Sequence, residues 1–386
     1  MEFMFYIPTK IYFGAGALER LATVPLPGKK ALIVVSKGGS MFRLGILDRV
    51  KGYLNKAGID ADVYQGISPN PNLDEITKGA LIARQGHCDF IIGLGGGSSM
   101  DAAKSIAVMA TNEGSYWDYV KGITGQGLPL ENKPLPIVAI TTTAGTGSEA
   151  DPWTVITKED TQEKIGFGTK DTFPTVSIVD PELMVTVPPD FTAYQGFDAL
   201  FHSIEGYISK TATPISDIFA LKSIELIKKY LPLAVKDGTN AEARGYMALA
   251  NTLSGFVESL SNCTSEHSIE HALSAYHPGL PHGAGLIMIA VEYHKLFLPT
   301  APDRYKDMAI ALGGKGNKAE EFIVLLTKLM KSCKVNTLKM SNYGIKKDEL
   351  SKYAENAMYV ISYLYEIDRL LLSYEDVIGI LQRSYK

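Results

Sequence analysis

The sequence contains few cysteines and no long hydrophobic run. Its 3 cysteines, Cys88, Cys263 and Cys333, are too far apart for a CxxC motif, so neither a disulfide framework nor a cysteine metal site is expected. The apolar runs fall well short of the roughly 20 residues that a membrane helix needs. The first residues, MEFMFYIPTK, lack the basic start and apolar region of a signal peptide. These absences favour a cytoplasmic protein with no membrane partner.

The charge balance also lacks a strong excess of either sign. The 38 basic and 42 acidic side chains give a net charge of −4, and no block is rich in lysine or arginine. We therefore expect a small-molecule substrate and no nucleic-acid partner. A chain of 386 residues exceeds one core of ordinary size, which predicts two domains.

Short apolar runs alternate with amphipathic stretches in the first half, which is typical of an α/β domain. Continuous apolar runs of this kind indicate a parallel sheet covered on both faces. After the double proline of MVTVPPD, long helical periodicities continue to the C-terminus. We therefore predict an α/β coenzyme-binding domain over 1–186 and an all-helical metal and catalytic domain over 187–386. The predicted strands cover 31–36, 61–66, 89–94, 135–141 and 175–180.

The stretch GLGGGSSMDAAK, residues 93–104, is a candidate phosphate-binding turn. It departs from the dinucleotide fingerprint because Ser98 stands where a third glycine belongs, and no glycine precedes Lys104 as a nucleoside-triphosphate loop requires. Glycines nevertheless let the backbone approach a ligand closely, and the start of the next helix attracts an anion. A pyrophosphate fits this turn; the alternative is a tight connection without a ligand.

Histidines are few and clustered, with five of the 7 in the stretch 267–294. His267 and His271 are four residues apart, and so are Asp198 and His202, so each pair shares one face of a helix. Two such faces can converge on one metal ion. For any single histidine, a hydrogen-bonded core position is the alternative.

A third element of this cluster is His282 in the motif LPHGAG, where Pro281 is expected to end a helix and Gly283 to loosen the chain. An aspartate and three histidines would leave one coordination position open, as a catalytic site requires. His271 stays outside the set because a second imidazole suits a proton carrier, and His277 and His294 are left unassigned. The candidate metal ligands are Asp198, His202, His267 and His282.

Four motifs together resemble the iron-dependent (group III) alcohol dehydrogenase family: GGGSSMDAAK, TTTAGTGSEA, GFDALFHSIEGY and EHSIEHALSAYHPGLPHGAG. The likeness covers nearly the whole chain. It implies the dehydroquinate synthase-like fold of that family. It also implies hydride transfer between NAD(P) and a small uncharged alcohol or diol, interconverted with its aldehyde or ketone. A homo-oligomer, preferably a dimer, is expected from the same resemblance.

The resemblance further implies roles for single residues. The four candidate ligands would hold Fe²⁺, with Zn²⁺ as a possible substitute, and His271 would be the catalytic residue beside the reacting atoms. Asp101 is expected in the first turn of a helix, where the dipole stabilises a carboxylate. The implied coenzyme contacts are Gly96, Gly97, Ser98 and Asp101 on the pyrophosphate and nicotinamide side, Thr142, Thr143 and Thr146 along the adenosine half, and Lys164 near the ribose.

Coenzyme choice is predicted from the end of the first strand. NAD-specific enzymes commonly place an acidic residue there for the ribose 2′-hydroxyl, whereas this chain has Ser36. Lys37, Ser40 and Arg43 follow and offer cations to a 2′-phosphate. We therefore expect Ser36 at the coenzyme and a preference for NADP over NAD; an ordinary solvated loop is the alternative.

Two rival functions share the architecture: a dehydroquinate synthase-like lyase and a polyol (glycerol-type) dehydrogenase. A phosphorylated acidic substrate would need basic residues around the metal, and 185–209 and 262–293 contain neither lysine nor arginine. A nucleotide-binding regulatory module would explain the glycine turn but not four metal ligands. The sequence therefore favours the dehydrogenase.

Overall fold

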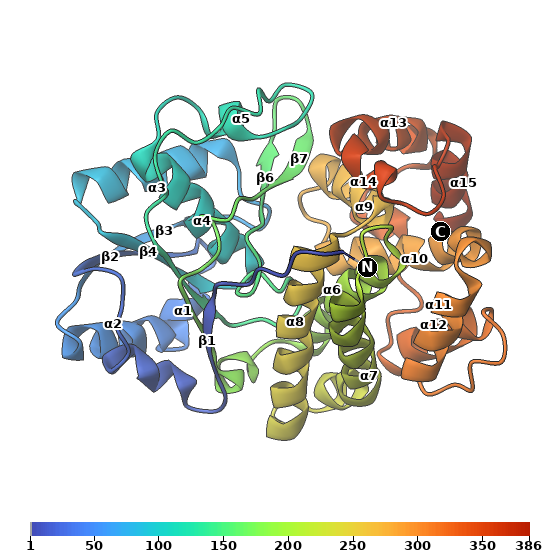
Figure 1. Cartoon of the computed structure of the whole chain (residues 1–386), viewed down its shortest axis with the longest axis horizontal. Helices are drawn as coiled ribbons and strands as arrows, with labels where there is room; N and C mark the ends of the chain where they lie inside the picture. Colours follow the sequence, from blue (N-terminus) through green and yellow to red (C-terminus); the bar gives the residue numbers. More distant parts are fainter. Residues whose placement is uncertain (1) are drawn as a thin grey trace. The chain divides into compact units, whose positions relative to one another are not determined.

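The chain divides by its internal contacts into two units, which are described one at a time. The first comprises residues 7–143 and 148–184; the second comprises 144–147 and 185–386 with the N-terminal residues up to Tyr6. The structure is a computed structural model and describes residues 2–386 (Figure 1).

The first unit is built on a parallel sheet of six strands in the order β1-β8-β5-β4-β2-β3. The five predicted strands are all present, and every neighbouring pair is parallel. The sequence reading missed β1, an edge strand of only four residues, KIYF, without a buried residue. The strands are β1 (Lys10–Phe13), β2 (Lys30–Ser36), β3 (Asp60–Ile67), β4 (Phe90–Gly95), β5 (Ile137–Thr141) and β8 (Val176–Val179).

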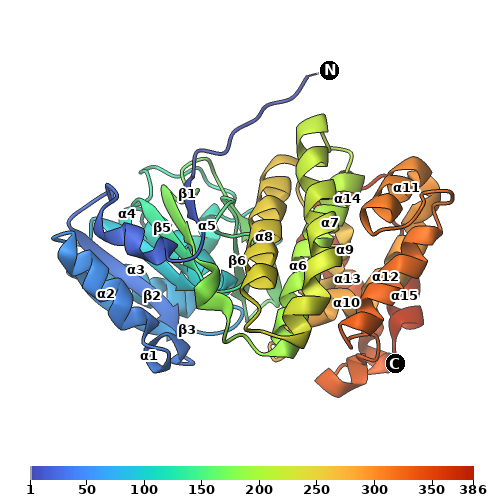
Figure 2. The ribbon, with the colours of Figure 1, turned by 90° about the horizontal axis from the view of Figure 1, so that it is seen from below.

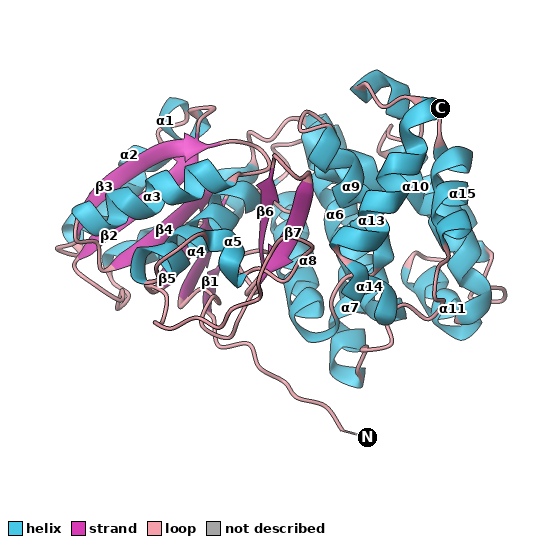
Figure 3. Ribbon diagram, turned by 90° about the horizontal axis from the view of Figure 1, so that it is seen from above, coloured by secondary structure: helices cyan, strands magenta, loops and turns pink. Residues whose placement is uncertain are grey.

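Helices cover both faces of this sheet (Figure 3). Ile33 and Val35 of β2 share a buried cluster with Val50 and Leu54 of α2 (Ile46–Lys56). Side chains alternate along a strand, so the intervening positions of β2 face the layer that holds α3 (Leu73–Gln85) and α4 (Gly97–Thr111). Burial on both faces explains why these strands are continuous apolar runs.

An antiparallel hairpin of β6 (Thr154–Lys158) and β7 (Glu163–Phe167) forms a second, two-stranded sheet. The sequence reading did not predict it, because the strands carry polar residues such as Glu163 and Lys164. Both of these side chains are buried, at 1 % and 4 % exposure. Hydropathy alone therefore does not show that the hairpin is buried.

The second unit is helical from residue 189 onward, which confirms the predicted change from alternating strands and helices to helices. Pro188 caps α6 and Pro189 is its first residue, a position where proline is tolerated because its missing N–H has no partner in the helix. Helices α6, α7 and α8 pack side by side (Figure 2). Within residues 2–386, no helix combines the length and apolar character needed to cross a membrane. The main helices are α6 (Pro189–Ile208), α7 (Pro214–Lys236), α8 (Ala241–Ser261), α9 (Ser265–Tyr276), α10 (His282–Phe297), α11 (Pro302–Ala311), α12 (Glu321–Ser332), α13 (Leu350–Val360), α14 (Ser362–Glu366) and α15 (Tyr374–Ser384).

Candidate functional site

Helix α6 carries Asp198 and His202 on one buried face. Each side chain is one turn from the other, and His202 Nε2 lies 3.8 Å from Asp198 Oδ1. Both residues are only 4 % exposed. The four-residue spacing therefore places a carboxylate and an imidazole together inside the second unit.

Two further histidines meet the same carboxylate oxygen. His267 Nε2 from α9 lies 3.8 Å from Asp198 Oδ1, and His282 Nε2 from α10 lies 3.4 Å from it. The rings of His202 and His267 are stacked, with centroids 4.5 Å apart. The structure thus brings the four candidate ligands together, and we call Asp198, His202, His267 and His282 the ligand cluster.

The Nδ1 atom of each histidine in the cluster already has a partner. His202 Nδ1 lies 3.2 Å from the carbonyl oxygen of Gly145, and His267 Nδ1 lies 2.5 Å from Glu205 Oε1. His282 Nδ1 is hydrogen-bonded to Glu270 Oε2. Such outer partners fix the tautomer and leave Nε2 available as a metal ligand.

Glu205 and Glu270 are fully buried, and the sequence reading assigned neither a role. Both stand close to a predicted ligand in the sequence, in FHSIE and HSIEH. A search for carboxylates beside metal-binding histidines would have found them, since this pairing is general.

The ligand cluster has the properties of a cation site. Asp198 Oδ1 and His267 Nε2 are buried and make no hydrogen bond with any residue of 2–386. Burying a polar atom without a partner is costly, and the two segments around the cluster offer no lysine or arginine. A divalent ion bound by Asp198 Oδ1 and the Nε2 atoms would satisfy these groups.

The pKa shifts of His202 and Asp198 suit metal binding, whereas Cys263 and Glu205 raise the pKa of His267 despite its burial. Burial lowers the pKa of His202 to about 4. Burial raises the pKa of Asp198, but the neighbouring His202, His282 and His267 lower it more, so this pKa lies below its ordinary value. A neutral His202 and an ionised Asp198 are the forms that bind metal ions.

His271 lies beside the ligand cluster on α9. Its ring centroid is 6.2 Å from that of His267 and 5.4 Å from that of His282. One atom each of Glu270, His271 and His282 also lie within 4.8 Å of one another. His271 is therefore near enough to the ligand cluster to serve as a proton carrier.

The two unassigned histidines have protein partners. His294 is fully buried between Glu266 and Tyr305, with Nε2 3.1 Å from Glu266 Oε2 and Nδ1 3.0 Å from the Tyr305 hydroxyl. His277 Nε2 lies 2.7 Å from the hydroxyl of Tyr353. These contacts give both residues a place in the packing of the helical unit.

The expected role of Pro281 was wrong. Helix α9 ends at Tyr276, and Pro281 caps the start of α10, of which His282 is the first residue. Gly283 lies inside this first turn, where a Cβ atom would stand 2.1 Å from the carbonyl oxygen of Tyr194. The glycine permits close contact with α6, so His282 is fixed on a helix rather than carried by a loop.

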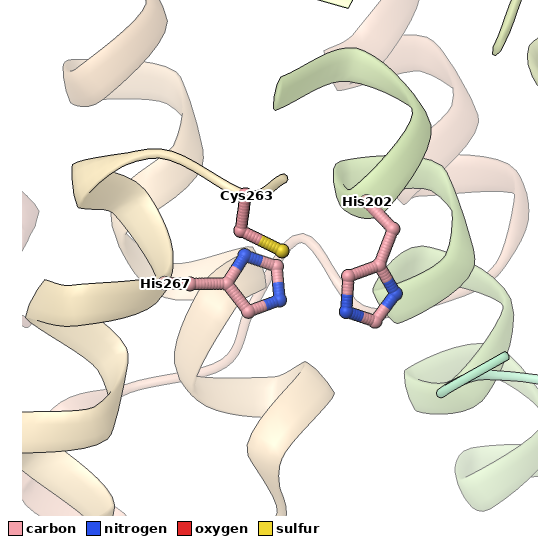
Figure 4. Close-up of side chains that lie close together, drawn as sticks. All are labelled: His202, Cys263 and His267. Atoms are coloured by element: carbon pink, nitrogen blue, oxygen red, sulfur yellow. The ribbon is translucent and has the colours of Figure 1, made fainter. Parts of the chain in front are cut away.

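Cys263, to which the sequence gave no role, lies beside two members of the ligand cluster. Its Sγ atom and one ring nitrogen each of His202 and His267 lie within 4.8 Å of one another (Figure 4). The thiol is buried, which raises its pKa well above the usual value. The spacing of four residues between Cys263 and His267 was the sequence feature that could have revealed it.

In the first unit, the glycine run forms the turn between β4 and α4. Gly95 has φ of +148°, and no side chain caps the start of α4. A Cβ on Gly96 would lie only 3.0 Å from Thr143 Cγ2. The predicted pyrophosphate residues Gly96, Gly97 and Ser98 therefore stand at an open helix N-terminus, with Thr143 against them.

The threonine motif follows β5, the neighbour of β4. The backbone N–H of Thr142 donates to the carbonyl oxygen of Gly95 at 2.9 Å, so Thr142 and Thr143 adjoin the glycine turn. Thr146 belongs by its contacts to the segment 144–147, which groups with the helical unit. Its two predicted companions, Thr142 and Thr143, group with the unit that contains the sheet.

Asp101 is placed differently from the expectation. It lies in the second turn of α4, since the first turn holds no acidic residue. Asp101 Oδ1 accepts from Ser148 Oγ at 2.6 Å and Oδ2 accepts from the Val155 N–H at 3.0 Å. These contacts, rather than the helix dipole, hold the carboxylate. Burial raises the pKa of Asp101, and the charges of Lys104 and of Lys164 on β7 oppose this rise.

Lys104 is a buried cation next to Asp101, and the sequence reading gave it no role. It is 0 % exposed, and its Nζ lies 2.8 Å from Ser148 Oγ, 3.0 Å from Asp151 Oδ1 and 2.6 Å from the Trp153 carbonyl oxygen. Burial raises the pKa of Asp151 to about 7, against the opposing charge of Lys104. We call Asp101, Lys104, Ser148 and Asp151 the lysine cluster.

Ser36 ends β2, which pairs with β4 in the sheet. In parallel strands the carboxyl ends meet at one edge, where α/β proteins bind ligands. Lys37 Nζ lies 2.5 Å from the buried Glu75 Oε1 and donates to Ser68 Oγ at 2.9 Å, so its charge is already compensated. Arg43 donates to the Gly38 carbonyl oxygen at 2.5 Å and remains beside the same turn.

Comparison with known proteins gives consistent matches along the chain. A family model described as iron-containing alcohol dehydrogenase matches residues 8–181, and the model of the C-terminal part of that family matches 192–385. Alcohol dehydrogenase 4 of Schizosaccharomyces pombe is 36% identical over 358 residues, covering 92% of this chain and 83% of that protein. An NADPH-dependent butanol dehydrogenase of Clostridium saccharobutylicum is 35% identical over 350 residues, covering 89% and 88%. The crystal structure of an archaeal alcohol dehydrogenase from a Red Sea brine pool superposes with a TM-score of 0.94 at 34% identity, over 100% and 99% of the two chains.

Proposed function

Because the chain belongs to the iron-containing alcohol dehydrogenase family and is an NAD(P)-linked alcohol dehydrogenase, we propose that its ligand cluster holds Fe²⁺, with Zn²⁺ as a substitute. The observation that carries this proposal is the pair of buried atoms without hydrogen-bond partners, Asp198 Oδ1 and His267 Nε2. When bound, the divalent ion polarises the substrate oxygen and lowers the pKa of an alcohol. Residues 187–386 would form the metal and catalytic domain, and residues 1–186 the coenzyme domain.

The protein side chains have separate tasks in this proposal. Glu205 and Glu270 orient His267 and His282 through their Nδ1 atoms. His271 takes the proton of the alcohol during oxidation and returns one during reduction. The surrounding segments carry no cation that would bind a phosphorylated or acidic substrate, so the substrate is a small uncharged alcohol, diol or aldehyde.

The coenzyme is proposed to bind at the carboxyl edge of the sheet. The start of α4, with Gly96, Gly97 and Ser98, would receive the pyrophosphate through backbone N–H groups. Thr142 and Thr143 adjoin this turn, and Asp101, on the same helix, accepts a hydrogen bond from Ser148. We assign Thr146 to the adenosine half and Lys164 to the ribose on the strength of the family motifs.

We also propose that NADP(H) is preferred over NAD(H). No carboxylate stands at Ser36, and Arg43 lies beside the adjoining turn, whereas Lys37 contributes less because Glu75 compensates its charge. Ser36→Asp should shift the ratio of kcat/KM values toward NAD(H), since a carboxylate repels a 2′-phosphate. Equal or better efficiency with NADH in the unmodified enzyme would contradict this preference.

The decisive experiment is turnover of short aldehydes and diols with both reduced coenzymes, before and after exhaustive chelation. We expect chelation to abolish turnover and Fe²⁺ to restore it, because no thiolate belongs to the ligand cluster. Unchanged turnover in the metal-free protein would refute the metal assignment. A lyase of the same architecture would give no net oxidation of NAD(P)H.

A homodimer is proposed for the assembly. Strand β1 is the edge of the main sheet, and Phe13 at its end is 44 % exposed. Edge strands of this kind invite pairing with another chain. Light scattering on the purified protein should give twice the mass of the chain. A measured mass equal to that of one chain would contradict the proposed dimer.

A further inference from the structure

Cys263 does not belong to the ligand cluster, yet its thiol lies close to two members of that cluster, His202 and His267. The residue lies between α8 and α9 and is 8 % exposed. Figure 4 shows its side chain directed toward the imidazoles of His202 and His267. The three candidate ligand atoms all lie within 4.8 Å of one another. Nothing in the proposed reaction uses this thiol.

The nitrogen atoms available to a metal ion can be identified. His202 Nδ1 and His267 Nδ1 are engaged by Gly145 and Glu205, so the Nε2 atoms are the remaining donors. His267 Nε2 is buried and has no hydrogen-bond partner among the described residues. This orphaned atom is an observation independent of the cysteine, and it points to a ligand.

We propose that His202, Cys263 and His267 form a second metal position, which overlaps the ligand cluster and takes soft or borderline divalent ions such as Cd²⁺ and Zn²⁺. Thiolate ligands select soft ions over Fe²⁺, and two imidazoles with one thiolate suit the tetrahedral geometry of zinc. Binding releases the thiol proton to solvent. Glu258 Oε2, 3.8 Å from His202 Nε2, offers an oxygen donor to complete the set.

The two positions cannot be filled together. Both require His202 Nε2 and His267 Nε2, but only the first uses Asp198 and His282. A soft ion at the second position therefore displaces Fe²⁺ from the first. This consequence rests on the proposed function, whereas the existence of the second position does not.

Cadmium binding to the metal-free, full-length protein tests the proposal. We expect a cadmium–thiolate absorption band in the ultraviolet for the wild type and for Cys333→Ser, a matched control because Cys333 is also buried, at 3 % exposure. In Cys263→Ser the band should vanish and Cd²⁺ affinity should fall at least roughly tenfold, the low end of the cost of losing an outer-shell partner. A band that persists in Cys263→Ser would overturn the proposal.

Three further measurements separate this position from a structural role and from the catalytic one. Cys263→Ala should lose the band as Cys263→Ser does, while thermal unfolding shows that both variants remain folded. Co²⁺ affinity should stay within about twofold of the wild type in both variants, well below the loss expected for a metal contact; an equal fall for Co²⁺ and Cd²⁺ would overturn the proposal. Asp198→Asn should keep the band and lose Co²⁺ affinity. Loss of the band in Asp198→Asn would also overturn the proposal. Unchanged Co²⁺ affinity in Asp198→Asn would instead contradict the ligand cluster on which the proposed function depends.

Discussion

The two units bury polar clusters of opposite character. In the lysine cluster, the ammonium of Lys104 lies among Asp151, Ser148 and a carbonyl oxygen at 2.6 to 3.0 Å. In the ligand cluster, Asp198 Oδ1 faces three imidazoles at 3.4 to 3.8 Å and accepts no hydrogen bond from residues 2–386. One cluster contains its own cation, and the other has the donors for a cation without a lysine or arginine to supply it.

This difference separates a cluster that maintains structure from one that binds. A buried charge needs compensation, and a covalently attached lysine provides it permanently. A cluster compensated only by imidazoles changes when an ion arrives, which is what a metal site requires. We therefore expect substitutions in the lysine cluster to affect stability, and substitutions in the ligand cluster to affect metal content.

The largest expected effect comes from His267→Ala compared with His271→Ala. His267→Ala removes a ligand and should reduce Fe²⁺ affinity by more than about 100-fold, beyond the usual cost of an outer-shell change, with loss of activity. His271→Ala should keep the metal and lose kcat. Metal analysis after gel filtration distinguishes the two; equal metal loss in both variants would mean that His271 is a ligand.

Lys104→Met should destabilise the protein without removing the metal. The substitution leaves Asp151 and Asp101 buried without their cation, and breaking a buried ion pair costs about 3–5 kcal/mol. Urea unfolding of the variant measures the loss, and Lys104→Met/Asp151→Asn is the control that should recover part of it. A loss below about 1 kcal/mol, the scale of an exposed pair, would show that Lys104 is not what holds this cluster.

Glu205→Gln should weaken metal binding without abolishing it. Glu205 holds His267 Nδ1 at 2.5 Å, and losing such an outer partner typically lowers affinity about 10- to 100-fold. Glu266→Gln is the matched control, since Glu266 is equally buried but pairs with His294. Calorimetric titration with Co²⁺ should give a lower affinity for Glu205→Gln than for Glu266→Gln. Identical affinities in the two variants would contradict a role for Glu205 in metal binding.

The last expected effect is a pH dependence from Asp368, a buried carboxyl of the helical unit, which is small over any single pH unit. Burial raises its pKa to about 8, against about 3.9 in an unfolded chain. The folded state therefore holds a proton that unfolding releases, so the stability from this group is complete below pH 4 and is lost as pH rises to 8. Asp368→Asn should remove this slope, which is at most about 1.4 kcal/mol per pH unit. If the melting temperatures of wild type and variant changed with pH in the same way from pH 5 to 8, the result would contradict this prediction.

Much of the fold was predictable because it follows from local patterns. The apolar runs of β2, β4 and β5 marked a sheet buried on both faces, and the double proline marked the start of α6. The hairpin β6–β7 escaped because Glu163 and Lys164 are buried polar residues, and hydropathy does not show which polar residues find partners.

The sequence by itself determined which side chains share a helix face, since a spacing of four residues places Asp198 with His202 and His267 with His271. Tertiary structure alone decided what surrounds them. Glu205 reaches His267 across 62 residues, and Lys104 reaches Asp151 across 47. Helical periodicity specifies neighbours within a few turns, whereas partners this far apart in the chain are chosen by how the helices and the sheet pack.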